Sequence, residues 1–118
     1  MSSRIRAAAS HGLLAAATVL ALFGWSCASS GAMRRGSAAE RSQDYDRAVA
    51  EYTAAVRERP GDTSARLALE RARLRASSDH FSRGRRMAAT GKLDEALVEL
   101  ELALELNPTN GDIDTDLR

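Results

Sequence analysis

The sequence predicts an all-α protein, with antiparallel helical hairpins around one long central helix and a signal segment in front of them. Only two of the 118 residues are proline, whereas the helix-favouring residues Ala, Leu, Arg and Glu are abundant. Aromatic residues make up only 4% of the chain, which disfavours a sheet. Apolar side chains also recur at helical spacing in two similar segments. This length and composition allow one small domain.

The start of the chain has the order of a secretory signal. Arg4 and Arg6 precede the uncharged run 13–23, and small residues follow this run. The run is shorter than the about 20 apolar residues that a membrane-spanning helix needs. An uncleaved anchor helix is the alternative. We therefore expect residues 1–27 to be a signal peptide and the protein to be exported.

The sequence around the single cysteine, GWSC with Cys27 last, resembles the lipobox of bacterial lipoproteins. The resemblance implies that Cys27 carries a lipid anchor and that the protein faces the periplasm from a membrane of the cell envelope. Ordinary cleavage after Ala28, which would give a soluble periplasmic protein, is the alternative. Residues 28–42 are small and polar and predict a flexible tether. Residues 43–118 then form the folded domain.

Two segments of the chain repeat each other. Residues 44–62 and 92–110 align with each other without a gap. In both segments the apolar positions fall at i, i+3, i+4 and i+7, which is one face of an α-helix. Pro60 and Pro108 end these stretches because the residue before a proline avoids helical angles. The pattern predicts helices over about 44–59 and 92–106.

The repeated pattern resembles the second helix of the tetratricopeptide repeat (TPR) family. That helix carries an aromatic residue or Leu, then Ala, a large residue, Ala and Pro at fixed spacing. The matching residues are Tyr45, Ala48, Tyr52, Ala55 and Pro60, and then Leu93, Ala96, Leu100, Ala103 and Pro108. Gly84 matches the close-packing position of the family's first helix, and Gly91 matches the turn; Gly36 would be the equivalent of Gly84 in the first unit. The resemblance covers roughly residues 41–110 and implies helical hairpins that serve in protein binding.

The spacing of the two segments predicts a long helix between them. A TPR unit has about 34 residues. The two segments lie further apart than one unit, which leaves an insertion of helical length, residues 63–76. These residues run on without Pro or Gly and predict one helix over about 63–89; an interruption near Ser77 and Ser78 is the alternative. Its apolar residues form two stripes about 180° apart. We therefore expect the helix to be a middle layer that takes 44–59 on one face and 92–106 on the other. The stripes are Ala65, Leu69, Ala72 and Ala76, and Leu67, Leu74, Phe81 and Ala88.

The positive charge of the domain is concentrated in the long predicted helix, and the negative charge in the segment that follows it. Residues 66–92 carry a net charge of +6, and residues 93–117 carry −8. A basic patch can bind nucleic acid, but no aromatic residues interleave with these arginines and no nucleic-acid motif is present. We expect no nucleic-acid partner. The pattern predicts instead that the basic long helix lies against the acidic last helix, where each surface ion pair contributes about 0–1 kcal/mol.

The sequence contains no set of residues that predicts catalysis. We find no Ser/His/Asp set and no phosphate-binding loop. Asp112, Asp114 and Asp116 alternate, but a calcium loop of the EF-hand type would need a Gly and a Glu further along. His80 is expected to be packed or solvated. We therefore expect no enzyme, no metal, no cofactor and no small-molecule substrate.

The last predicted helix is apolar nearly all round, so part of it is left without a partner. Val98, Leu102 and Leu106 remain after one face packs inward. We expect these side chains to bind another protein, and Arg66, Arg73 and Arg85 on the long helix to supply matching charge. Ile113 and Leu117 begin a further amphipathic stretch.

The order of signal, repeat, long helix and second repeat resembles, more loosely, the N-terminal TPR segment ahead of secretin-type secretion proteins. This implies a scaffold in assembly of an envelope secretion or pilus system, with a secretin or other envelope component as partner. The chain would then be a stand-alone relative or a truncated N-terminal part of such a protein. A self-associating structural module of the cell envelope is the alternative.

Overall fold

The computed structural model describes residues 26–117, with the side chains of residues 31–113 and of Thr115. This part of the chain contains no strand, so the predicted all-α fold is confirmed. The predicted signal segment, up to residue 25, and the side chain of Cys27 lie outside the described residues. The helices are α2 (Ser26–Arg41), α3 (Tyr45–Glu58), α4 (Thr63–Ala89), α5 (Leu93–Leu106) and α6 (Gly111–Leu117).

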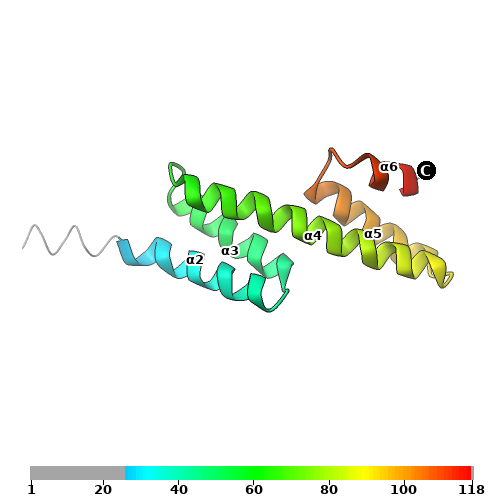
Figure 1. The fold of residues 1–118 in the computed structure, drawn as a ribbon, viewed down its shortest axis with the longest axis horizontal. Helices are drawn as coiled ribbons and strands as arrows, with labels where there is room; N and C mark the ends of the chain where they lie inside the picture. Colours follow the sequence, from blue (N-terminus) through cyan, green and yellow to red (C-terminus); the bar gives the residue numbers. More distant parts are fainter. Residues whose placement is uncertain (1–25, 118) are drawn as a thin grey trace, which may run out of the picture.

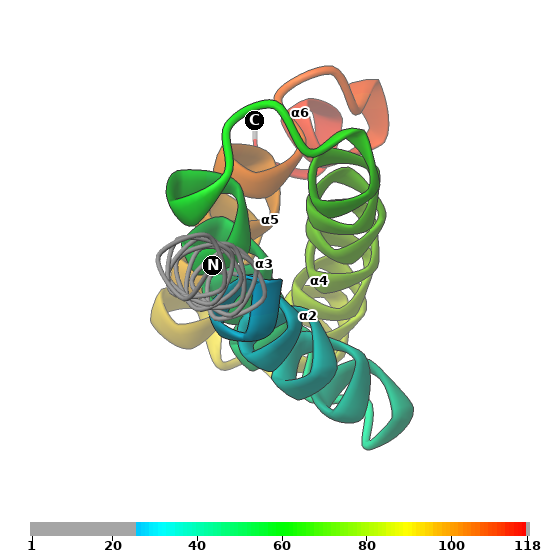
Figure 2. The same ribbon diagram turned by 90° about the vertical axis from the view of Figure 1, so that its left-hand side faces the viewer.

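The long helix α4 is shared by the two halves of the molecule (Figure 1). Helix α3 packs along its first half and is itself packed antiparallel against α2, whereas α5 packs antiparallel to the second half of α4. Seen along the molecule, α3 and α5 lie on the same side of α4 (Figure 2). Helix α6 folds back over the C-terminal end of α5.

The helix boundaries follow local sequence signals. Asp44 and Asp62 cap α3 and α4, because each carboxylate accepts a hydrogen bond of 3.2 Å from a backbone N–H three residues on. Helices α3 and α5 each end two residues before a proline. The helices predicted over 44–59, 63–89 and 92–106 are thus present, and α4 is uninterrupted.

The prediction of a flexible tether over residues 28–42 is wrong, because this segment forms most of α2. Ala32, Gly36 and Ala39 lie on one face of α2 and are buried. At Gly36 the backbone approaches so closely that an added Cβ would lie 2.5 Å from Cε1 of Tyr52. Small residues therefore make this helix a packing surface, although it lacks the large apolar residues that usually mark one. The folded domain begins in α2 and not at residue 43.

The same hairpin geometry recurs in the second half of the molecule. At Gly84 an added Cβ would lie 2.9 Å from Cγ of Leu100, which matches the contact between Gly36 and Tyr52. The turns correspond as well, since Gln43 has φ 60° and its counterpart Gly91 has φ 79°. The internal repeat thus extends over the helix that precedes each predicted segment.

The prediction that α4 packs through two opposed faces is also wrong. Its buried residues form one continuous stripe, and the exposed fractions of Leu67 and Leu74 are 64% and 55%. Steps of four residues advance by about 40° around the helix, so the stripe turns slowly along α4. The two halves of the molecule take successive lengths of this stripe instead of opposite faces. The stripe consists of Ala65, Ala68, Ala72, Ala76, Ser77, His80 and Gly84.

The core consists mainly of alanines, and Tyr52 is the largest of its fully buried side chains. The predicted packing residues Ala48, Tyr52, Ala55, Ala96, Leu100 and Ala103 are buried, and Tyr45 is half-buried. Pro60 and Pro108 lie exposed in the turns. Leu93 differs from the prediction, because 68% of its surface is exposed at the start of α5. Ile113, on α6, is fully buried.

Candidate functional site

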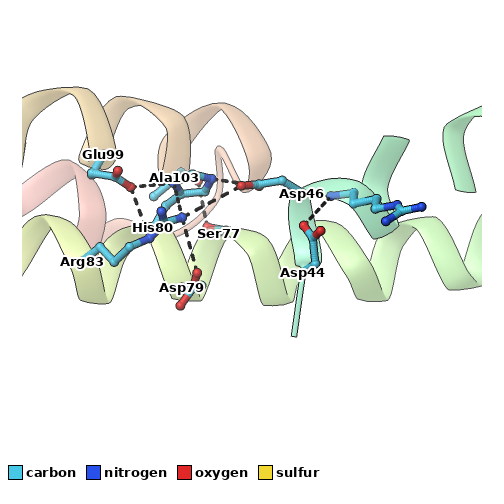
Figure 3. Close-up of polar contacts among 9 residues, drawn as sticks. Asp44, Asp46, Ser77, Asp79, His80, Arg83, Glu99 and Ala103 are labelled. Atoms are coloured by element: carbon cyan, nitrogen blue, oxygen red, sulfur yellow. Dashed lines mark hydrogen bonds and ion pairs between the residues drawn. The ribbon is translucent and has the colours of Figure 1, made fainter. Parts of the chain in front are cut away.

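A buried histidine joins three helices at the centre of the molecule (Figure 3). His80, on α4, lies between two carboxylates: Nδ1 is 2.7 Å from Oε2 of Glu99, and Nε2 is 2.9 Å from Oδ1 of Asp46. Asp46 comes from the first turn of α3 and Glu99 from the middle of α5. Carboxylate oxygens accept hydrogen bonds, so the imidazole can donate an N–H to either carboxylate. His80 therefore ties the two halves of the molecule together.

Arg83 adds a positive charge to this junction. Its Nη2 lies 3.3 Å from Asp79, 3.9 Å from Asp46 and 3.0 Å from Nδ1 of His80. Its Nε is 3.5 Å from Oε2 of Glu99. This Nε is buried and forms no hydrogen bond within the described part of the chain. Both nitrogens of the His80 ring are engaged within the protein. The group is thus arranged to hold helices together, with no ring nitrogen turned toward solvent.

Next to the histidine, Ser77 adds a direct contact between α4 and α5. Its hydroxyl is buried and donates a 2.7 Å hydrogen bond to the backbone carbonyl of Ala103. That carbonyl oxygen already accepts the hydrogen bond from the Asn107 amide that closes α5. In the second half of the α4 stripe, the polar residues Ser77 and His80 are thus buried, whereas the first half of the stripe consists of alanines.

A second polar cluster ties α2 to α3 and α4. Glu40 accepts a 2.8 Å hydrogen bond from the Tyr52 hydroxyl and two more, of 3.1 and 3.0 Å, from Arg71. Arg75 lies 3.7 Å from the same carboxylate. The hydrogen bonds from Arg71 lower the pKa of Glu40 and outweigh the opposing effect of burial. Burial, and then the hydrogen bond to Glu40, raise the pKa of Tyr52.

Ion pairs repeat between the two halves as the helices do. Arg35 lies 2.8 Å from Glu51, and Arg83 lies 3.5 Å from Glu99. The two arginines occupy equivalent positions of the internal repeat, and so do the two glutamates. The recurrence of Glu51 and Glu99 is visible in the sequence, but Arg35 lies in the segment that we expected to be a tether. The alignment of the two repeated segments, extended toward the N-terminus, is the signal that could have found the arginines.

The exposed apolar side chains of the molecule gather on α5 and α4. Val98 and Leu102, two of the predicted partner-binding residues, point away from α4 with exposed fractions of 56% and 38%, and the third, Leu106, is half-buried. Ala96, Leu100 and Ala103 take the inner face of the same helix. We define the outer α5 face as Val98, Leu102 and Leu106.

The predicted basic residues are not gathered beside this face. Arg66 and Arg73 share one side of α4, and Arg73 lies 3.8 Å from Glu70. Arg85 lies on another side, with its guanidinium 5.7 Å from the centre of the Phe81 ring. The expected contact between the basic α4 and the acidic α5 is present, and Arg83 and Glu99 contribute to it.

None of the described helices is long and apolar enough to cross a lipid bilayer. In the same part of the chain, no cluster of three His, Cys, Asp or Glu residues could hold a metal ion. In comparisons with known proteins, the chain matches no protein-family model and no curated sequence.

Proposed function

We propose that this chain is a protein-binding scaffold of the bacterial cell envelope, built from TPR-type helical hairpins. The observation that carries the proposal is the outer α5 face. Val98 and Leu102 stand in solvent on a helix whose other side is closely packed against α4. Large exposed apolar side chains that neighbour one another are typical of surfaces that bind a partner. Partner contact would remove them from water.

The form of the scaffold supports the same function. Two hairpins with equivalent glycine contacts share one rigid helix, so the exposed side chains keep fixed positions relative to each other. A preformed surface loses little conformational entropy on binding, which favours affinity. The hydrogen bonds of His80 to α3 and α5 add to this rigidity.

The location belongs to the proposal. A lipid on Cys27 would hold the chain to a membrane with its helical domain in the periplasm, where it would help to assemble a secretion or pilus system. Its partner would be a secretin or another envelope protein. Since α2 begins at Ser26, the helical domain would stand close to the membrane surface without a long tether.

The experiment is a crosslinked pull-down of the tagged full-length chain from a solubilised membrane fraction. We expect capture of a secretion or pilus component by the wild type, and loss of that component with Leu102→Glu, because a carboxylate replaces apolar contact. Leu74→Glu, at an exposed leucine of α4, is the matched control and should retain capture. Cys27→Ala should move the protein out of the membrane fraction.

Other results would contradict the proposal in distinct ways. If the chain captures only itself, and Leu102→Glu converts an oligomer into a monomer, the protein is a self-associating module. If capture is unaffected by Leu102→Glu, the outer α5 face is not the binding surface. Membrane association that survives Cys27→Ala would refute the lipid anchor.

A further inference from the structure

Helix α4 carries two exposed leucines on the side that points away from α3. A step of two residues turns an α-helix by about 200°, so Leu67 and Leu74 point nearly opposite to the buried Ala65 and Ala72. The residues of this side follow one another at steps of four and three residues and therefore form one row along the helix. We define the outer α4 face as Leu67, Arg71, Leu74, Ser78, Phe81 and Arg85.

Positive charge surrounds the leucines of this face. Helix α4 contains seven arginines but only two acidic residues, Glu70 and Asp79, so its net charge is +5 with its histidine neutral. None of the residues of the outer α4 face is acidic. Arg71 and Arg75 pair with Glu40, yet 50% and 51% of the two arginine side chains are exposed, against 11% of the Glu40 side chain. The carboxylate thus lies beneath the guanidinium groups, and the arginines present positive charge to the solvent.

The row of residues on the outer α4 face is nearly straight. Residues seven positions apart drift by only about 20° around an α-helix, so Leu67, Leu74 and Phe81 lie on one line. Phe81 is half-buried, and the guanidinium of Arg85 lies over its ring. From Leu67 to Arg85 the row is about 27 Å long. A flat surface can therefore contact the leucines and the arginines of this face at the same time.

The composition of the outer α4 face is typical of a helix that lies in the interface of a membrane with anionic lipids. In such an interface, apolar side chains enter the boundary between headgroups and acyl chains. Each arginine extends its apolar stem over the same surface while its guanidinium binds phosphate. Anionic headgroups attract basic residues within about one Debye length of the surface. The charge and the apolar surface of this face therefore both match an anionic lipid surface.

We propose that the outer α4 face lies on an anionic lipid surface, with Leu67 and Leu74 at the boundary of the acyl chains and the arginines at the headgroup phosphates. This inference rests on the membrane location in the proposed function. Helix α2, which contains Cys27 in its first turn, starts at the same end of the molecule as α4 (Figure 1). An anchor at Cys27 would thus hold the start of the outer α4 face near the membrane.

The lipid contact orients the domain and does not replace the anchor. Contact through two leucines and exposed charges is reversible and weakens with salt. Because Val98 and Leu102 point away from α4, this orientation leaves the outer α5 face free for the partner. The two apolar surfaces of the molecule then have separate roles, one toward the lipid and one toward a protein.

The test uses the full chain with Cys27→Ala and one new cysteine, Leu74→Cys, that carries a fluorophore sensitive to the polarity of its surroundings. Vesicles of phosphatidylcholine with phosphatidylglycerol are the anionic probe, and vesicles of phosphatidylcholine alone are the neutral one. We expect the anionic vesicles to shift the emission to shorter wavelength in a saturable manner, and added salt to weaken this effect. The same fluorophore at Leu102→Cys should show no shift, because Leu102 points away from α4.

A charged residue within the row tests the contact itself. In the chain labelled at Leu74→Cys, Leu67→Glu should raise the lipid concentration at half of the full shift by about tenfold or more, because it removes an apolar contact and repels the headgroups. Leu93→Glu, at a leucine of α5 with a similar exposed fraction, is the matched control and should leave this concentration unchanged. Both leucines are mostly exposed, and equal melting temperatures would show that both variants fold.

Other results would overturn the inference. An equal shift with neutral vesicles would mean adsorption by apolar contact alone, and an equal shift at Leu102→Cys would mean that α4 does not orient the domain. Lack of a shift with either kind of vesicle, or an unchanged lipid dependence with Leu67→Glu, would exclude a lipid contact of this face. If an acidic protein is then crosslinked in a manner that depends on Leu67, that protein is the occupant.

The proposed function is judged separately from this lipid contact. Its partner is captured in a manner that depends on Leu102, and its anchor is tested by Cys27→Ala in the membrane fraction. Capture that depends on Leu102 would leave the scaffold function standing even if no vesicle shifted the emission. A shift on anionic vesicles without any captured partner would instead support the lipid contact and contradict the scaffold.

Discussion

At the scale of single residues, Gly36 packs closely against the ring of Tyr52. A methyl group at Gly36 would lie 2.5 to 2.9 Å from three carbon atoms of the tyrosine ring, which is itself fully buried. Gly36→Ala should therefore lower the free energy of unfolding by about 1–3 kcal/mol, the usual cost of overpacking. Urea denaturation would measure it.

Gly61 provides the matched control for this substitution. A Cβ there meets no atom within 4 Å, so Gly61→Ala should leave the urea midpoint nearly unchanged. If Gly36→Ala were equally harmless, α2 would not be held against α3 as the structure has it. The segment before residue 43 would then be a tether after all.

The Glu40 cluster should make stability depend on acid pH. Arg71 holds the pKa of Glu40 below its ordinary value of 4.5 in the folded chain. A carboxylate with a lowered folded pKa stabilises the fold above its unfolded pKa, and this contribution is lost as the pH falls through the folded value. Glu40→Gln should therefore show a smaller loss of stability than the wild type between about pH 5 and pH 3.

Urea midpoints at several pH values would measure this difference. Arg71→Ala removes the group that lowers the pKa and should also flatten the acid limb, while it lowers stability near neutral pH because Glu40 loses its main partner. Parallel curves for wild type and Glu40→Gln would show that the carboxylate makes no net contribution.

At the scale of elements, the sequence predicted those helices whose apolar residues are large and periodic. The helices over 45–58 and 93–106 were expected because Tyr, Val and Leu alternate with charged residues at helical spacing and a proline follows. The long helix was expected because no Pro or Gly interrupts it before residue 84. Each of these features lies within one short stretch of the chain, so it can be recognised from the sequence without knowledge of the tertiary contacts.

Helix α2 was missed because its packing depends on what it meets. Ala32, Gly36 and Ala39 have little apolar surface of their own, and the Gly and Ser around them are common in tethers. Their role becomes clear only beside Tyr52, which fills the space that they leave.

The side of α4 that packs against the other helices was missed for a related reason. The stripe of Leu67 and Leu74 is the more apolar, yet the alanine side allows the closer contact.

The candidate site was predictable in part. The surplus leucines of α5 followed from helical periodicity, and Val98 and Leu102 are indeed exposed. The junction around His80 was not predictable, because Asp46 and Glu99 are 34 and 19 residues from it in the sequence. Only the fold brings these three side chains together.

At the scale of the whole molecule, α4 is the element through which the halves depend on each other. Its first half packs on α3 and is hydrogen-bonded to α2 through Arg71 and Glu40, and its second half packs on α5, with His80 bridging α3 and α5. Ser78, which is exposed, lies between these two lengths. Breaking the helix there should uncouple the halves without removing a core side chain.

Ser78→Pro removes one backbone hydrogen bond of α4 and places the ring against the preceding turn, at a cost of about 3 kcal/mol. We expect amides of α5 to exchange faster than those of α3, because α5 packs mainly on the second half of α4 and on the short α6, whereas α3 packs on both α4 and α2. Hydrogen exchange with mass spectrometry of segments 45–58 and 93–106 would measure this. Ser78→Ala, the matched control, should keep both segments protected alike. If Ser78→Pro lowered the protection of both segments by the same amount, the two halves would be coupled through direct contacts such as that of His80 and Asp46, and the continuity of α4 would be unnecessary for their joint stability.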